Sequence, residues 1–204
     1  IPSRSVVGNC KIPGFHDNFG VEIPRFYLPD LRAAAAGPRS SRVAATLPPD
    51  QGHHSRAVLR LAPGQRIILF DGAGSWAEAI LAGAAGDRLP EAVTAALAGP
   101  VHEEPAPSPR LTLASAVPKG DRAEWLVEQA SQLNVTDLRW LACERGVVKP
   151  QEGGGKLGKW RRLAIESAKQ CGRTHLLQIH ALAPLAEVLR DAAGRGEQVL
   201  WLEP

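Results

Sequence analysis

The chain has 204 residues, of which 44% are hydrophobic and 22% charged, and its formal net charge is +3. This ordinary globular composition supports a packed core, and the mild basicity permits a nucleic-acid partner without requiring one. No apolar run approaches the roughly 20 residues of a membrane span. The three cysteines lie far apart without a C-x-x-C pair, which argues against a zinc site or a disulfide framework and favours a reducing cytoplasm.

The first part of the chain is dominated by short strand signals. Residues 1–23 lack apolar periodicity and are expected to form a poorly ordered extension. Strands are predicted over residues 24–28, 42–47, 66–70, 76–81 and 91–97, with a helix over 50–61. The glycine-rich stretch 71–75 predicts a hairpin turn between two of these strands. Residues 24–99 are therefore predicted to form a small β-barrel-like domain.

A proline-rich stretch separates this region from one of different character. Residues 100–109 contain four prolines and are expected to act as a semi-rigid linker. From 110 to 204, strands predicted at 111–117, 137–143, 176–180 and 198–202 alternate with helices over 121–133, 157–171 and 185–194. This alternation predicts a parallel sheet with helices on its faces, in which the strand 111–117 is buried on both sides. Trp125 and Trp160 lie on the apolar stripes of their helices, so both are predicted to pack in the core.

Basic residues recur in the loops that follow the predicted strands and helices. Lys119, Arg122, Arg145, Lys149 and Arg173 suit phosphate contacts, although surface ion pairs are the alternative. The adjacent His53 and His54 would point about 100° apart on a helix and have no acidic or cysteine partner at metal spacing, so no metal site is predicted. The glycines at 153–155 are better read as a flexible loop than as a nucleotide cradle. The sequence identifies no general base and no nucleophile.

Several motifs resemble those of the ribosomal RNA small subunit methyltransferase E family. Their order and spacing match that family over about 180 residues, from Pro24 to Pro204. The matching pieces are Pro24-Arg25-Phe26-Tyr27, His54 with Val58-Leu59-Arg60, Leu69-Phe70-Asp71-Gly72, Lys119-Gly120-Asp121 with Glu124, Glu144-Arg145 with Val148-Lys149, Trp160 with Ala164-Ile165, and Gln170-Cys171-Gly172-Arg173. The resemblance implies an α/β protein with an N-terminal PUA-like β-barrel that helps to hold rRNA. It also implies a C-terminal SPOUT domain that binds S-adenosylmethionine in a trefoil knot.

The resemblance also implies an activity and its partners. Family members methylate N3 of a uridine in 16S rRNA of the 30S subunit and act as cytoplasmic homodimers. The residues expected to bind RNA are Arg25, His54, Arg60, Lys119, Arg122, Arg145, Lys149, Gln170 and Arg173. Those expected to bind the cofactor are Leu202, Glu203 and Pro204. The alternative function is a non-catalytic RNA-binding or ribosome-associated module, which the barrel and its basic residues would also suit.

Two departures from the family pattern bear on these expectations. The family's Glu-Leu-Gly-Val after the first SPOUT helix is replaced by Gln132-Leu133-Asn134-Val135. The Gly-Pro-Glu-Gly-Gly loop and the last knotted segment, which make most of the cofactor pocket, would follow Pro204. The sequence as given is therefore expected to lack methyltransferase activity.

Overall fold

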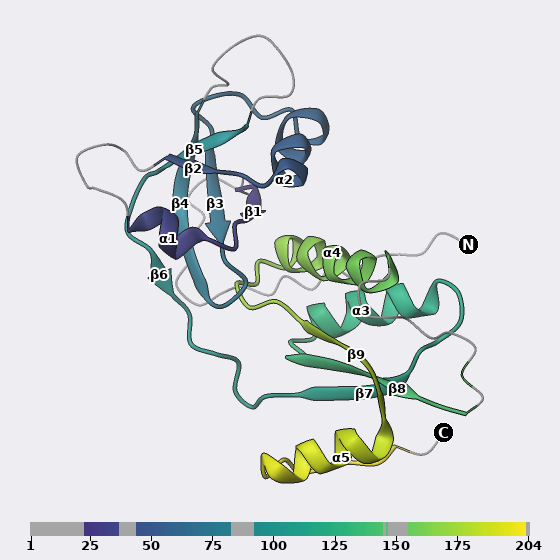
Figure 1. Ribbon diagram of the computed structural model, residues 1–204. Helices are drawn as coiled ribbons and strands as arrows, with labels where there is room; N and C mark the ends of the chain where they lie inside the picture. The colour runs from purple at the N-terminus through teal and green to yellow at the C-terminus, as the bar shows by residue number, and fades with distance from the viewer. Residues whose placement is uncertain (1–22, 37–43, 83–91, 145, 147–154, 203–204) are drawn as a thin grey trace. The chain divides into compact units, whose positions relative to one another are not determined.

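The computed structural model describes residues 23–36, 44–82, 92–144, 146 and 155–202 (Figure 1). The chain divides into two compact units, each of which is described by itself. The first unit comprises residues 1–106 together with 168–175, and the second comprises residues 107–167 and 176–204. A short stretch from late in the sequence therefore belongs to the first unit. Within the described residues, no helix combines the length and apolar character that crossing a bilayer requires.

The first unit is built on a six-stranded sheet in the order β1-β3-β4-β5-β2, with β6 paired to β4. Strands β1 and β3 are parallel, and the other pairs are antiparallel. The elements are β1 (Arg25–Tyr27), α1 (Leu31–Ala35), β2 (Ala44–Thr46), α2 (Pro49–His53), a π-helical turn η1 (His54–Val58), β3 (Arg66–Phe70), β4 (Ser75–Leu81), β5 (Thr94–Leu97) and β6 (His102–Glu103). The five strands predicted between residues 24 and 99 are confirmed, whereas β6 lies in the segment expected to be a linker.

The hairpin between β3 and β4 is held by Asp71, as the turn signal predicted. One carboxylate oxygen, Oδ1, accepts the backbone N–H groups of Ala73 at 2.7 Å and Ser75 at 2.9 Å. Gly74 has φ +108°, and a Cβ atom there would lie 2.6 Å from the His175 ring. Glycine therefore meets both a conformational and a steric requirement at this position. Alternate residues of β4 then point into a buried core formed with Phe26, Leu69 and their neighbours.

The second unit contains a three-stranded parallel sheet in the order β7-β8-β9. Its elements are β7 (Thr112–Ala116), α3 (Arg122–Gln132), β8 (Asp137–Ala142), α4 (Gly155–Gln170), β9 (Gln178–Pro184) and α5 (Leu185–Gly194), and the last three residues of α4 belong to the first unit. In Figure 1, α3 and α4 lie over one face of the sheet and α5 lies over the other. The predicted alternation of strands and helices, and the parallel sheet, are confirmed.

The core of the second unit lies between the sheet and the α3–α4 layer. Leu138 and Trp140 of β8 pack against small residues of α3 and against Leu157 and Trp160 of α4. The rings of Trp140 and Trp160 have centroids 4.9 Å apart at an interplanar angle of 46°, a tilted arrangement that aromatic pairs favour. Trp160 is only 3% exposed, so its predicted place in the core is confirmed.

Three local predictions in this unit are wrong. Trp125 is 61% exposed, because α3 buries the face carrying Ala123, Val127 and Ala130 instead. Strand β7 is only partly buried and is not covered on both sides. Residues 198–202 form no strand, and their apolar side chains are exposed. A strand requires a neighbour that satisfies its backbone, and within the described residues this run pairs with none.

Candidate functional site

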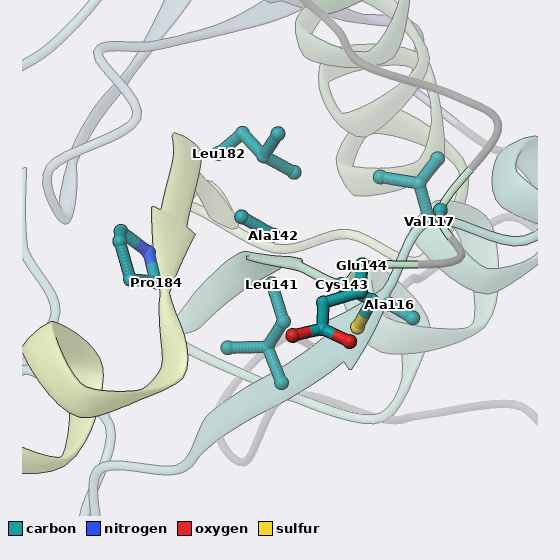
Figure 2. A pocket seen from close by; sticks show the side chains of 9 residues that line it. Ala116, Val117, Leu141, Ala142, Cys143, Glu144, Leu182 and Pro184 are labelled. Carbon is teal, nitrogen blue, oxygen red and sulfur yellow. The ribbon is translucent and has the colours of Figure 1, made fainter.

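A cavity of about 330 Å³ lies at the carboxyl edge of the parallel sheet in the second unit (Figure 2). The ends of β7, β8 and β9 and the residues after them line it: Ala116, Val117, Leu141, Ala142, Cys143, Glu144, Gly146, Leu182 and Pro184. Parallel strands bring their carboxyl ends to one edge, which is where open α/β sheets bind ligands. Most of the lining is apolar, while Glu144 adds a carboxylate and Cys143 a thiol. This composition suits a largely apolar ligand that also carries positive charge.

An irregularity in the pairing of β8 with β9 shapes this cavity. Arg139 pairs with His180, but Leu141 pairs with Ala183, so β9 contributes one extra residue beside Trp140. Such a bulge re-aims the side chains of the bulged strand. Leu182 lies in the bulged stretch and both lines the cavity and packs against the core. The shape of the cavity at the bulge therefore depends on how the core of the second unit packs.

Two half-buried or buried cations distinguish the first unit. Lys169 is 9% exposed, and its Nζ lies 3.3 Å from Gln51 Oε1 and 5.5 Å from the centroid of the Phe26 ring. The guanidinium carbon of Arg25 lies 5.7 Å from the centroid of the Phe70 ring. Its Nε and Nη2 are buried and have no hydrogen-bond partner among the described residues. Burial lowers the pKa of Arg25, and the negative charge of Glu104 only partly opposes this effect.

The segment 168–175 brings two of the predicted RNA-binding residues, Gln170 and Arg173, into the same unit as Arg25. Gly172, with φ +74°, lies two residues after Gln170, the last residue of α4, where a left-handed glycine commonly ends a helix. The Gly74 N–H then donates to the Thr174 carbonyl at 3.3 Å. The Thr174 hydroxyl donates to the Glu104 carboxylate. These contacts fix the segment next to the β3–β4 hairpin.

The remaining predicted site residues lie at several places. His54 begins η1 and presents its ring edge-on to Phe26 at 6.5 Å, and Arg60 is exposed with φ +52°. Lys119 and Arg122 are exposed at the start of α3 in the second unit. Leu202 is 86% exposed and does not line the cavity. The others lie outside the described residues: Arg145, Lys149, Glu203 and Pro204.

Sequence reasoning missed Lys169 and Glu144 as site residues. Lys169 is buried near the end of α4, and its only signal was its position directly before Gln170. Glu144 follows strand β8 and was identified in a motif, yet its carboxylate was not assigned to a pocket. The position of a polar residue just after a parallel strand was the signal available for it.

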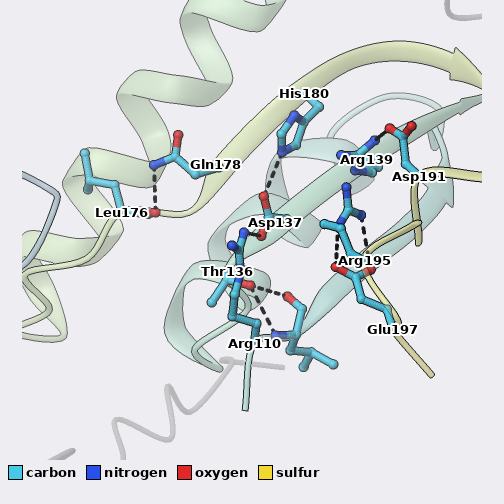
Figure 3. Close-up of polar contacts among 11 residues, drawn as sticks. Arg110, Thr136, Asp137, Arg139, Leu176, Gln178, His180, Asp191, Arg195 and Glu197 are labelled. Atoms are coloured by element: carbon cyan, nitrogen blue, oxygen red, sulfur yellow. Dashed lines mark hydrogen bonds and ion pairs between the residues drawn. The ribbon is translucent and has the colours of Figure 1, made fainter. Parts of the chain in front are cut away.

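A second polar cluster lies at the amino end of β8 and centres on Asp137 (Figure 3). The carboxylate of Asp137 accepts from Arg110 Nη2 at 2.7 Å and lies 2.8 Å from His180 Nε2. Arg139 forms an ion pair with Asp191 of α5 at 2.9 Å. Burial raises the pKa of Asp137, but hydrogen bonds from Arg110 and His180 outweigh this, so the pKa lies below its usual value. Because its carboxylate is well supplied with donors, the cluster serves to hold β8 rather than to bind a ligand.

Two family models match the chain. An RNA methyltransferase domain matches residues 104–203, and an RNA methyltransferase PUA domain matches residues 47–90. The predicted fold class, a PUA-like β-barrel followed by a SPOUT α/β domain, is therefore confirmed, and it is that of an RNA methyltransferase.

Individual relatives indicate which family of RNA methyltransferases the chain resembles. Ribosomal RNA small subunit methyltransferase E of Synechocystis is 32% identical over 149 residues, which cover 73% of this chain and 46% of that protein. The Bacillus subtilis protein of the same name is 24% identical over 147 residues, which cover 70% of this chain and 56% of that protein. The chain belongs to the ribosomal RNA small subunit methyltransferase E family, as its motifs predicted. It spans about half the length of these two relatives.

Solved structures agree with this placement. A methyltransferase from Legionella pneumophila, in complex with the cofactor SAM, is 26% identical with a TM-score of 0.68 and covers 84% of this chain and 67% of its own. The small subunit methyltransferase E from Neisseria gonorrhoeae, bound to S-adenosyl methionine, is 26% identical with a TM-score of 0.63 and covers 82% of this chain and 64% of its own.

Proposed function

We propose that this protein takes part in S-adenosylmethionine-dependent methylation of uridine N3 in 16S rRNA. The observation that carries the proposal is the cavity at the carboxyl edge of the sheet, in a chain whose relatives are named as small subunit methyltransferases. Two similar structures are described with the same cofactor bound. We assign the cavity to this cofactor.

The lining residues fit such a ligand. Val117, Leu141 and Leu182 offer apolar walls to the adenine and the methionine chain, and the Glu144 carboxylate complements the positive charge that the cofactor carries. When bound, the cofactor supplies an electrophilic methyl group. The contribution of the protein is to hold the target base in line with that group and to exclude water. The uracil N3–H proton must be lost in the process.

We further propose that the nine predicted RNA-binding residues contact the rRNA. Two buried donors of Arg25 have no partner in the part of the chain that the structure describes, and this supports the proposal because a phosphate oxygen would satisfy donors that otherwise cost free energy. The 30S subunit is the proposed partner, the cytoplasm the proposed compartment and a homodimer the proposed state. The proposed domains are a barrel at 24–99 and a methyltransferase domain at 110–204, joined by the linker at 100–109.

The assignment of the cavity can be tested by filling it. Ala142 is exposed at the end of β8 and lines the cavity, so Ala142→Trp should block it without disturbing the core. Calorimetry with S-adenosylmethionine should detect binding to the parent chain and none to Ala142→Trp. The matched control is Ala193→Trp, at an exposed position of α5 away from the cavity, which should bind as the parent does. Equal binding by Ala142→Trp would move the cofactor site elsewhere.

The alternative function, an RNA-binding module without catalysis, is favoured by the cations of the first unit. It predicts that the chain binds 16S rRNA fragments with a normal salt dependence while calorimetry detects no cofactor. Cofactor binding, followed by a reverse-transcription stop at a methylated uridine in 30S subunits, would exclude this alternative.

A further inference from the structure

Arg25 and Glu104 carry opposite charges and lie at the same hairpin of the first unit. The guanidinium carbon of Arg25 is 5.7 Å from the ring centroid of Phe70, the last residue of β3. Glu104 contacts the turn that follows, where its backbone N–H donates to the Gly74 carbonyl at 2.8 Å. Burial lowers the pKa of Arg25 and the negative charge of Glu104 opposes this effect, so the two groups interact electrostatically.

The carboxylate of Glu104 is nevertheless bound to a different donor. It accepts from the hydroxyl of Thr174, a residue that is only 1% exposed. Meanwhile Nε and Nη2 of Arg25 are buried and have no partner among the described residues. A guanidinium can donate two parallel hydrogen bonds to a carboxylate, so it competes strongly with a hydroxyl for such an acceptor. The contact with Thr174 therefore determines where the carboxylate points.

The backbone of Glu104 is held in place without that hydroxyl. Besides the bond from its N–H to Gly74, its carbonyl oxygen lies 3.2 Å from His175 Nε2. A Cβ atom at Gly74 would lie only 2.8 Å from the same oxygen, so the hairpin packs closely against this residue. Removal of the Thr174 hydroxyl would therefore free the carboxylate while the backbone of Glu104 stays where it is.

A freed carboxylate would find strong donors on Arg25. Buried donors without a partner cost free energy, and a carboxylate oxygen would satisfy them. The same bond would neutralise the charge that attracts an anion from outside the protein. The Glu104 carboxylate and a phosphate group would then compete for the same two nitrogens.

We propose that Thr174 is a positioning residue that keeps the Glu104 carboxylate off the Arg25 guanidinium and so leaves the donors of Arg25 open to a phosphate. The proposal rests on the phosphate contact of Arg25 included in the proposed function. It adds the residue that keeps this contact available.

Binding of a 16S rRNA fragment at several salt concentrations tests the proposal. In Thr174→Val the slope of log affinity against log salt should fall by roughly 0.7–0.9, as expected for the loss of one phosphate contact in Arg25→Met. Thr174→Ser keeps the hydroxyl and should bind as the parent does. Thr46→Val, the same change at an exposed position of β2, is the control. Circular dichroism checks that each variant is folded.

A second change separates this role from a merely structural one. In Thr174→Val/Glu104→Gln the freed side chain carries no charge and cannot neutralise Arg25, so the slope should return to that of the parent. Damage to the packing around Thr174 would not be repaired by a substitution at Glu104.

Thermal unfolding without RNA or cofactor tests the same idea independently. The Tm shifts of Arg25→Met and Glu104→Gln are measured singly and together, first in the parent and then in Thr174→Val. Groups in direct contact give shifts that do not add. The departure from additivity should therefore be larger in Thr174→Val than in the parent.

Two outcomes would overturn the role of Thr174. One is a departure from additivity that is no larger in Thr174→Val than in the parent. The other is a salt slope that falls in Arg25→Met but stays at the parent value in Thr174→Val, or falls there without being restored by Glu104→Gln. An unchanged slope in Arg25→Met would instead remove rRNA as the anion, and the unfolding experiment would still decide the role of Thr174.

Discussion

One cluster in each unit shows how differently buried charged groups can be paired, although each unit also holds other buried polar atoms without a partner among the described residues. In the second unit the Asp137 carboxylate is paired with Arg110 and lies within hydrogen-bonding distance of His180. In the first unit two nitrogens of Arg25 are buried without a hydrogen-bond partner among the described residues. A buried polar group whose partners are all present stabilises the fold, whereas one that lacks them costs free energy until a ligand provides them. The comparison therefore separates a cluster whose charges are paired within the fold from one that we propose contacts rRNA.

The largest expected effect concerns the core of the second unit alone. Trp160→Ala removes a side chain that packs on Trp140 and should lower the free energy of unfolding by about 3–5 kcal/mol. Hydrogen exchange should show faster exchange of β8 amides, with β3 and β4 amides unchanged. An equal loss of protection in β3 and β4 would show that the two units unfold together and would weaken the comparison.

The next effect tests the Asp137 cluster. Asp137→Asn should cost about 1–3 kcal/mol of stability at neutral pH, because Arg110 and His180 lose a charged acceptor. The lowered pKa of Asp137 means that this stabilisation is complete above the pKa of the unfolded state, about 3.9, and is lost as the pH falls through the lower folded value. The difference in Tm between parent and variant should therefore shrink in acid. A difference independent of pH would show that the charge of Asp137 contributes nothing.

The smallest effect on stability is expected at Arg25, where the effect on binding should be clear. Arg25→Met keeps the stem that packs near Phe70 and removes donors that have no partner among the described residues, so stability should change by less than about 1 kcal/mol. If Arg25 contacts a phosphate, the slope of log affinity for rRNA against log salt should fall by roughly 0.7–0.9. Arg66→Met is the control, since exposed Arg66 is already paired with Glu78. An unchanged slope in Arg25→Met would remove Arg25 from the proposed RNA surface.

The two tryptophans show where sequence periodicity predicts burial correctly and where it does not. Both lie on apolar stripes of helices, yet Trp160 is buried and Trp125 is exposed. Helix α3 buries alanines and one valine, which contribute little to an apolar pattern because they are small. A hydrophobic pattern in which large side chains count most therefore selects the wrong face of a helix whose buried residues are small.

Local signals predicted local structure well. The turn chemistry of Asp71–Ser75 placed β3 and β4 correctly, because the turn is determined by adjacent residues. Strand β6 has only two residues and exists through its pairing with Ser75 and Trp76, so nothing in its own sequence marks it. Residues 198–202 have strand composition but no described neighbour to pair with. Strand formation depends on a partner, which composition does not record.

The candidate site was predictable in position but not in detail. Alternating strands and helices located the carboxyl edge where the cavity lies, and the motif at Glu144 lies beside it. The bulge in β9 and the position of Lys169 near Gln51 arise from tertiary packing. Contacts between residues so distant in sequence leave no local pattern.

The segment 168–175 also has a consequence for how the protein is made. Thr174 binds Glu104, which precedes it by 70 positions, so the first unit cannot be completed when its own strands emerge from the ribosome. At synthesis rates of 5–20 residues per second, the segment 168–175 would be synthesised roughly 4–14 s after the rest of the first unit. During that interval the Phe26 ring and the Gln51 side chain lack the cover of Lys169. Translation pauses between residues 106 and 175 would prolong the period in which chaperones can bind the incompletely folded first unit.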